Sequence, residues 1–322
     1  MPKTCYIHFG LHKTASTSFQ ESCANNTKIL EDNGIYYPIF LCRPANKLKI
    51  TNHSIPIFSM CVHNPSEYHV NKRWGISDKI EAVNSSYKRQ LEAHLGSAKN
   101  LLFSGEDISM LGEARLSRFI DKIKDYGYKI KATALVRSPY SMLCSQLQET
   151  IKGGKYTNLI SLNNSSKSSH ENQINGKANI LKKLQLVLNE SIGFHSFERA
   201  CADTFGPAGY LFREFLGLDP AKFEYTKGNE SYSNLTVRLQ NEFNKINPAF
   251  DNKKMNPSHL KLDSSIDHNF KFSGKFLLTE HEHSLVKEFL DGESEALYKL
   301  TGMDEMLSQT IQFSNPIYQQ LL

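Results

Sequence analysis

The sequence predicts an α/β fold: a central parallel sheet flanked by helices, with an irregular insertion and a helical C-terminal part. Short apolar runs alternate with amphipathic helical patterns along the first two thirds of the chain, and polar residues follow several of these runs. A chain of 322 residues is long enough to bury a sizeable core. We therefore expect a single domain over residues 1–322, with loops or insertions at about 38–76 and 153–176.

The expected strands and helices alternate in chain order. Strands are predicted for the run "TCYIHFG" from residue 4 and for residues 100–104, 129–136 and 191–198, and helices for residues 78–95, 113–126, 140–152 and 177–189. Alternation of this kind is typical of a parallel sheet with helices on both faces. Ligands of such sheets bind beyond the carboxyl ends of the strands, so the residues after each run are the first place to look for a site.

Two segments lack clear periodicity. Residues 38–76 carry proline, asparagine, histidine and the only tryptophan, whereas residues 153–176 are poor in apolar residues and rich in serine and asparagine. Such composition indicates a loop or lid rather than core. From about residue 228 helical patterns return, as in "NLTVRLQNEFNKI" and "EHSLVKEFLDGESEALYKL".

The composition is that of a soluble globular protein, with 39% hydrophobic and 22% charged residues. A net charge of +5 favours anionic ligands but is too small to indicate nucleic-acid binding. The sequence contains no apolar run of about 18 residues, so we expect no membrane span. No secretory signal is evident either. The six cysteines are scattered, which predicts reduced thiols, a cytoplasmic location and no metal site.

The stretch "GLHKTASTSFQ" has the chemistry of an anion-binding loop. It leads from a strand into an expected helix, whose free N–H groups and dipole attract phosphate. Lys13 adds a positive charge and several hydroxyl groups add donors. The predicted loop residues are Gly10, His12, Lys13, Thr14, Ala15, Ser16, Thr17 and Ser18.

This loop differs from the ATP-binding pattern GxxxxGK[ST], because His12 stands where that pattern needs a glycine. No well-placed aspartate for magnesium is evident either. A nucleotide kinase with a degenerate loop, and a non-catalytic nucleotide- or glycan-binding protein, are the alternative interpretations.

A second motif, "LVRSPYSMLCSQLQE", places Arg137 at a strand end and Ser145 eight residues later on the following helix. The planar guanidinium of arginine suits a phosphate, and a helical serine can donate to the same group.

Together the two motifs resemble those of sulfotransferases that use 3′-phosphoadenosine-5′-phosphosulfate (PAPS). The resemblance implies a P-loop-like nucleotide-binding fold in which "IHFGLHKTASTSFQ" holds the 5′-phosphosulfate. Arg137 and Ser145 would then bind the 3′-phosphate, and adenosine 3′,5′-bisphosphate would be the product. Two departures stand out: Ala15 occupies a position where glycine is common, and Ser18 one where many members place a tryptophan under the adenine.

The resemblance also implies a reaction. A sulfuryl group would pass by in-line displacement to a hydroxyl of a carbohydrate or small-molecule acceptor, with Lys13 neutralising the leaving oxygen and no metal required. The acceptor must lose a proton. Glu106 in "FSGED" is the first candidate for the base, with capping of the next helix as its alternative role, and His53 is the second.

Other polar residues have structural interpretations. We expect His8 to be a satisfied core residue, "TEHEH" (279–283) to be an exposed helix start, and the pair Lys182-Lys183 to lie on a solvated face.

Overall fold

The computed structural model describes residues 3–97, 99–160, 169–226, 231–251, 254–262, 274–307 and 311–314. Contacts divide the chain into two compact units: unit 1 comprises Met1–Val136 and Asn179–Gly228, and unit 2 comprises Arg137–Ala178 and Asn229–Leu322. The boundary falls inside helix α8 (Ser169–Leu188). Each unit is described by itself, and the single domain stays a prediction.

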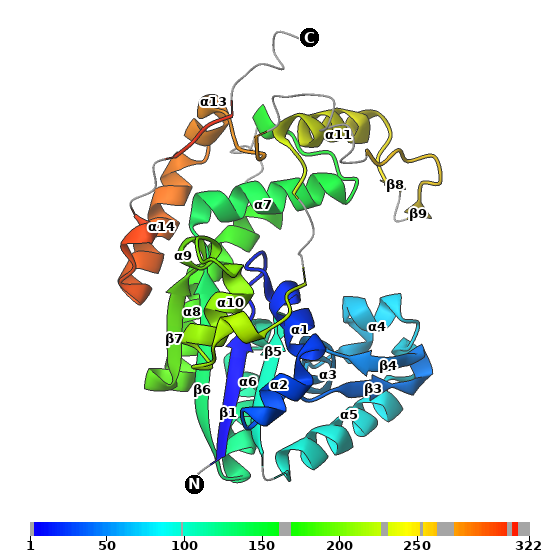
Figure 1. Cartoon of the computed structure of the whole chain (residues 1–322). Coiled ribbons are helices and arrows are strands. Elements are labelled where there is room, and N and C mark those ends of the chain that lie inside the picture. The colour runs from blue at the N-terminus through cyan, green and yellow to red at the C-terminus, as the bar shows by residue number, and fades with distance from the viewer. Residues whose placement is uncertain are drawn as a thin grey trace. The chain divides into compact units, whose positions relative to one another are not determined.

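Unit 1 is built on a five-stranded sheet in the order β2-β5-β1-β6-β7 (Figure 1). All four neighbouring pairs are parallel. The strands are β1 (Lys3–Phe9), β2 (Ile35–Tyr36), β5 (Asn100–Gly105), β6 (Tyr128–Val136) and β7 (Ile192–Ser196). Four of the five were predicted, and the α/β class with a central parallel sheet is confirmed.

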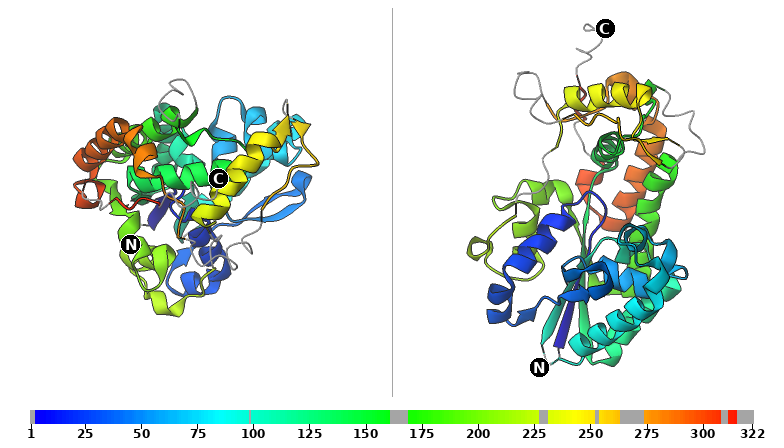
Figure 2. Two further views of the ribbon diagram at one scale, coloured as in Figure 1. Left: turned by 90° about the horizontal axis from the view of Figure 1, so that it is seen from above. Right: turned by 90° about the vertical axis from the view of Figure 1, so that its right-hand side faces the viewer.

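Helices cover both faces of this sheet (Figure 2). Successive side chains of a strand point to opposite faces. Leu102 of β5 therefore packs with Phe19 and Phe212 in one core cluster, whereas Phe103 contacts Phe119 on the other face, with ring centroids 6.5 Å apart. The first face carries α1 (Ser16–Asn25), α2 (Thr27–Asp32), α9 (Phe197–Cys201) and α10 (Gly206–Glu214); α6 (Glu113–Asp125) lies on the second, and α5 (Ile80–Leu95) precedes β5.

Residues 38–76 are regular, so the prediction of an irregular insertion was wrong there. They contain β3 (Phe40–Cys42), β4 (Lys47–Ile50), α3 (Ser54–Cys61) and α4 (His69–Arg73). These elements are too short to show a period in the sequence. Single buried anchors such as Phe40, Ile50 and Ile57 hold them in place.

The predicted loop 153–176 needs a similar correction at its end. Helix α8 begins at Ser169, eight residues before the expected start. Serine and asparagine are modest helix formers but do not prevent a helix. Residues 161–168 lie outside the described part of the chain.

Unit 2 is mainly helical, as predicted for the C-terminal part. It contains α7 (Pro139–Lys152), α11 (Asn234–Ile246), α13 (Glu280–Ser284), α14 (Lys287–Thr301) and the hairpin β8 (Phe250–Asp251)–β9 (Lys254–Met255). Short 3₁₀ turns occur in both units: η1 (Arg43–Ala45), η2 (Pro65–Glu67), η3 (Ser77–Lys79), η4 (Asp107–Met110), η6 (Asn189–Ser191), η7 (Pro220–Lys222) and η8 (Asp304–Met306).

Helix α13 starts at "TEHEH" as predicted, and Thr279 forms a capping box with Glu282. The expectation of an exposed start holds for Glu280 and His281 but was wrong for Glu282 and His283, which are buried. Glu282 accepts two hydrogen bonds from Arg238, at 2.8 and 2.9 Å. A buried bidentate ion pair therefore joins α11 to α13 within unit 2.

None of the helices described here is both long and apolar enough to cross a membrane.

Two buried histidines should make the stability of unit 1 depend on pH. Burial lowers the pKa of His8 from 6.5 to about 3 and that of His53 from 6.5 to about 4. Below about pH 6.5 the unfolded chain binds protons that the folded chain excludes, so the free energy of unfolding falls as the pH falls. Between about pH 7 and pH 5 we expect a loss of about 2 kcal/mol per histidine.

Chemical denaturation of the wild type and His53→Gln at both pH values measures this loss. Between these pH values the variant should lose about 2 kcal/mol less than the wild type, whatever its stability at neutral pH. An unchanged dependence in the variant would contradict burial of a neutral His53.

Candidate anion-binding and catalytic site

The candidate site lies where β1 and β5 end side by side in unit 1. Their parallel register pairs Phe9 with Gly105, and the N–H of Gly10 donates to the carbonyl of Gly105 at 3.1 Å. The loop that follows β1 and the residues that follow β5 therefore leave the sheet together. This is the edge at which parallel sheets bind ligands.

The contact between these two strand ends leaves no room for side chains. A Cβ on Gly10 would lie 2.3 Å from Ser16 Oγ and 3.0 Å from Glu106 Cγ. A Cβ on Gly105 would lie 2.5 Å from the backbone nitrogen of Ser54. The two glycines thus bring the start of α1, Glu106 and the start of α3 against the strand ends.

The loop backbone alternates in the sign of φ. Lys13 has φ 65° and Ala15 has φ 59° with ψ 25°, and Thr14 between them is not among the residues with positive φ. Positive φ is uncommon for residues other than glycine. Such alternation can turn successive N–H groups toward one side, which makes a concave anion site. The hydroxyl of Thr14 donates to the carbonyl of Leu11 at 2.5 Å and fixes the turn.

The first turn of α1 has backbone N–H groups that no described side chain caps. The N-cap residue is Ala15. The Ser16 side chain is 1% exposed, yet its Oγ has no hydrogen-bond partner among the described residues. Buried polar atoms are nearly always paired, so an unpaired hydroxyl at a helix N-terminus fits an absent anionic ligand.

The remaining loop residues differ in their positions. Lys13 and His12 are half-buried and Thr17 is exposed. Ser18 Oγ donates to the carbonyl of Thr226 at 2.9 Å, so its proton is committed to the chain.

Two acidic residues after β5 approach His12. Its Nδ1 lies 3.2 Å from Glu106 Oε2 and its Nε2 lies 3.8 Å from Asp107 Oδ1. Tyr68 donates to Asp107 Oδ2 at 2.5 Å, and the Asp107 N–H donates to Ser54 Oγ at 2.7 Å. Burial and the neighbouring Asp107 raise the pKa of Tyr68, so its hydroxyl stays a donor.

Glu106 is the sequence candidate that this geometry leaves available. It occupies the N-cap position of η4, but its carboxylate forms no capping hydrogen bond within the described residues. Its side chain is 25% exposed. The contact with His12 holds a partly accessible carboxylate beside the loop.

The structure argues against His53 as a base. His53 is fully buried and both ring nitrogens are used. Its Nδ1 accepts from the N–H of Ser104 at 2.8 Å, so the proton sits on Nε2, which donates to the carbonyl of Pro38 at 2.6 Å. This histidine links β5 to the segment before β3.

His8 is a core residue, as predicted, but it is not fully satisfied. Its Nδ1 lies 2.8 Å from Ser104 Oγ, while its buried Nε2 has no partner in the described part of the chain. Its ring packs on Phe19 of α1, with centroids 5.0 Å apart.

Arg137 and Ser145 belong to unit 2, whereas the loop belongs to unit 1. Arg137 follows the last residue of β6, and its Nε donates to Ser141 Oγ at 2.7 Å. Ser145 is half-buried on α7. Ser141 was not selected from the sequence, although a helical spacing of four residues is a recognisable signal.

The prediction that Lys182 and Lys183 both lie on a solvated face was wrong for Lys183, which is half-buried. Its Nζ donates to the carbonyls of Ser109 and Leu111, both at 2.6 Å, and burial lowers its pKa. It therefore closes the turn η4 that follows Glu106. Tyr68 and Lys183 both lie far from Glu106 in the sequence, and no local pattern pointed to either.

A metal site is not evident in the described ranges, where no three His, Cys, Asp or Glu side chains are grouped to hold an ion. No family model, no curated protein and no solved structure matches this chain.

Because Ala15 has a positive φ, its replacement should change the free energy of unfolding in a defined direction. Ala15→Gly relieves a left-handed conformation that costs about 1–2 kcal/mol for an alanine, but adds freedom to the unfolded chain. We expect the free energy of unfolding to stay the same or rise by up to about 1 kcal/mol. Ala15→Val should lower it by about 1–3 kcal/mol.

Ala24→Gly within α1 is the matched control. The same change at a helical φ should destabilise by about 1 kcal/mol in urea denaturation. If Ala15→Gly destabilised as much as Ala24→Gly, the left-handed loop would be refuted.

Proposed function

We propose that this chain is a PAPS-dependent sulfotransferase that transfers a sulfuryl group to a hydroxyl of a carbohydrate or small-molecule acceptor in the cytoplasm. The observation that carries the proposal is the β1–α1 loop. It combines alternating φ, an uncapped helix N-terminus and the buried, unpaired hydroxyl of Ser16 with Glu106 alongside. Sulfuryl transfer to a hydroxyl needs a site that binds the anionic donor, with a base beside it to accept the proton of the hydroxyl.

Each group has a defined role in this reaction. The acceptor oxygen forms a bond to sulfur as the bond from sulfur to the bridging phosphate oxygen breaks, and the acceptor proton passes to Glu106. Lys13 and the N-terminus of α1 stabilise the negative charge on the leaving oxygen. His12, 3.2 Å from Glu106, orients the carboxylate.

The second motif supplies the nucleotide part of the proposal. Arg137 and Ser145 bind the 3′-phosphate by analogy with the family that the sequence resembles. The bond from Arg137 Nε to Ser141 fixes the guanidinium on α7. The partner that stacks on the adenine is not assigned.

Magnesium-dependent kinase chemistry has less support. Asp107, two residues after the end of β5, already accepts a hydrogen bond from Tyr68 and lies 3.8 Å from His12 Nε2. His12 also replaces the glycine of the ATP loop. No specific observation favours a purely binding function.

Binding of adenosine 3′,5′-bisphosphate tests the donor site. Titration calorimetry should detect binding to the wild type, and Lys13→Ala should weaken it tenfold to about a hundredfold, as expected for a charged hydrogen bond. Lys28→Ala removes an exposed lysine of α2 and should leave the affinity unchanged. Absence of binding at millimolar nucleotide would refute the proposal.

A transfer assay with labelled PAPS over a panel of hydroxyl acceptors tests the chemistry. Glu106→Gln should lower kcat by about 10²–10⁴ and leave nucleotide affinity unchanged, because the amide cannot accept the proton. Glu21→Gln on the exposed side of α1 serves as the control. A Glu106→Gln variant with full activity would remove Glu106 as the base.

A further inference from the structure

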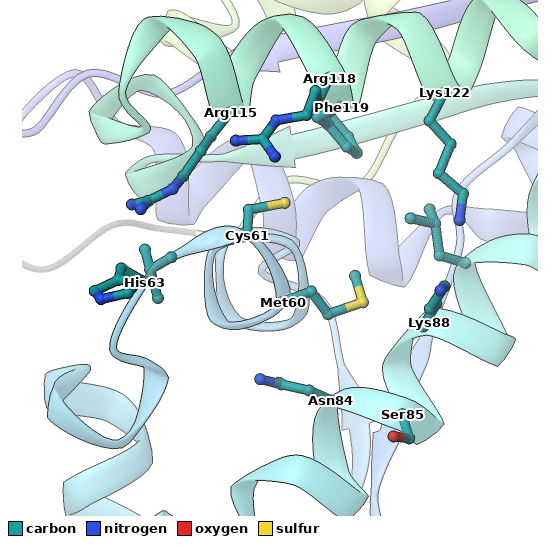
Figure 3. Close-up of a pocket in the computed structure, with 12 residues that line it drawn as sticks. Met60, Cys61, His63, Asn84, Ser85, Lys88, Arg115, Arg118, Phe119 and Lys122 are labelled. Carbon is teal, nitrogen blue, oxygen red and sulfur yellow. The ribbon is translucent and has the colours of Figure 1, made fainter.

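A pocket in unit 1 lies at the end of α3, between α5 and α6 (Figure 3). Its volume is about 690 Å³, in the range of small-molecule sites. Basic side chains dominate its rim. Figure 3 shows Arg115 and Arg118 of α6 directed toward the end of α3, which carries Cys61, and Lys122 of α6 directed toward Lys88 of α5.

These basic groups are largely unneutralised. Lys122 pairs with Glu92 at 2.7 Å. Arg115, Arg118 and Lys88 have no carboxylate within ion-pair distance in the described residues. Like charges three and four residues apart on one helix repel each other. Several cations around one pocket favour an anionic ligand.

Hydrogen bonds hold the pocket in shape. Ser59 Oγ donates to Asn84 Oδ1 at 2.7 Å, and Asn84 Nδ2 donates to the Ser59 carbonyl at 2.9 Å. Asn71 Nδ2 donates to Ser59 Oγ at 2.9 Å. The end of α3 is thus fixed to α5. Buried Leu91 and Phe119 supply an apolar floor.

The positive charge is local rather than continuous. Helix α6 also carries Glu113, Asp121 and Asp125, none of which lines the pocket. A long polyanion would meet these carboxylates, whereas a compact ligand would meet only the basic rim.

We propose that this pocket binds a compact ligand with at least two negative charges, a phosphate ester or a polycarboxylate, whose apolar part rests on Phe119 and Leu91. Arg115 and Arg118 are the principal contacts. The proposal does not depend on the proposed function, because no residue of the β1–α1 loop lines the pocket.

Cys61 reports on occupancy. It is half-buried in the pocket wall, and Cys201 is an exposed cysteine that serves as the internal reference. Alkylation followed by peptide mass spectrometry measures both thiols with inorganic pyrophosphate or citrate as the probe. At least one probe should slow alkylation of Cys61 without slowing that of Cys201. Protection by pyrophosphate alone would indicate a phosphate ligand. Protection by citrate alone would indicate a carboxylate ligand.

Variants separate this pocket from the loop. The double variant Arg115→Ala, Arg118→Ala should abolish the protection of Cys61. Two control variants should retain it: Lys124→Ala, which removes an exposed lysine of the same helix, and Lys13→Ala in the loop. Burial raises the pKa of Cys61 to about 11 and slows alkylation, so calorimetry with the same probes gives a second readout. The double variant should weaken binding at least tenfold, as for a lost charged hydrogen bond.

The proposal is overturned if neither probe protects Cys61 at millimolar concentration, whether or not heat is measured, because the β1–α1 loop could also give heat. It is also overturned if Lys124→Ala removes the effect equally, or if Lys13→Ala abolishes it, since the loop would then be the site.

Discussion

The close contact between the ends of β1 and β5 is the constraint on which the candidate site depends. The N–H of Gly10 donates to the carbonyl of Gly105, and neither residue has room for a side chain. Ser104, one residue earlier, bonds to His8 of β1 through its hydroxyl and to His53 through its backbone. A buried polar network of this kind fixes the strand ends in a low-dielectric environment, and the loop and Glu106 inherit their positions from it.

Much of this edge could be predicted from local sequence. The apolar runs of β5 and β6 predicted the centre of the sheet, because a strand buried on both faces is mostly apolar. The edge strand β7 is only partly buried, and its short run was a weaker signal. The glycine, the lysine and the hydroxyl-rich turn indicated a tight turn into a helix at this edge, and its anion-binding role stays a prediction. Ala15 occupies a position where glycine is common in the resembled motif, and the structure gives the physical reason: its φ is positive.

The rest depends on contacts between residues far apart in the chain. His53 has the sequence of a pocket residue, yet it is buried with both nitrogens bonded, which only the arrangement of β5 and the segment before β3 determines. Lys183 looked like surface charge, but it binds two carbonyls of the turn after Glu106. The basic pocket on α6 was missed for the same reason: Arg115, Arg118 and Lys122 are ordinary helix residues until Lys88 and the end of α3 are placed beside them.

An oxyanion site in the β1–α1 loop is the feature on which the proposed reaction depends. Backbone amide NMR of the uniformly labelled chain, titrated with adenosine 3′,5′-bisphosphate, tests it most directly. The largest shifts should occur at the amides of residues 12–18, because these N–H groups would donate to the phosphate. Saturable shifts that leave residues 12–18 unmoved, or that centre on the pocket of α6, would contradict it.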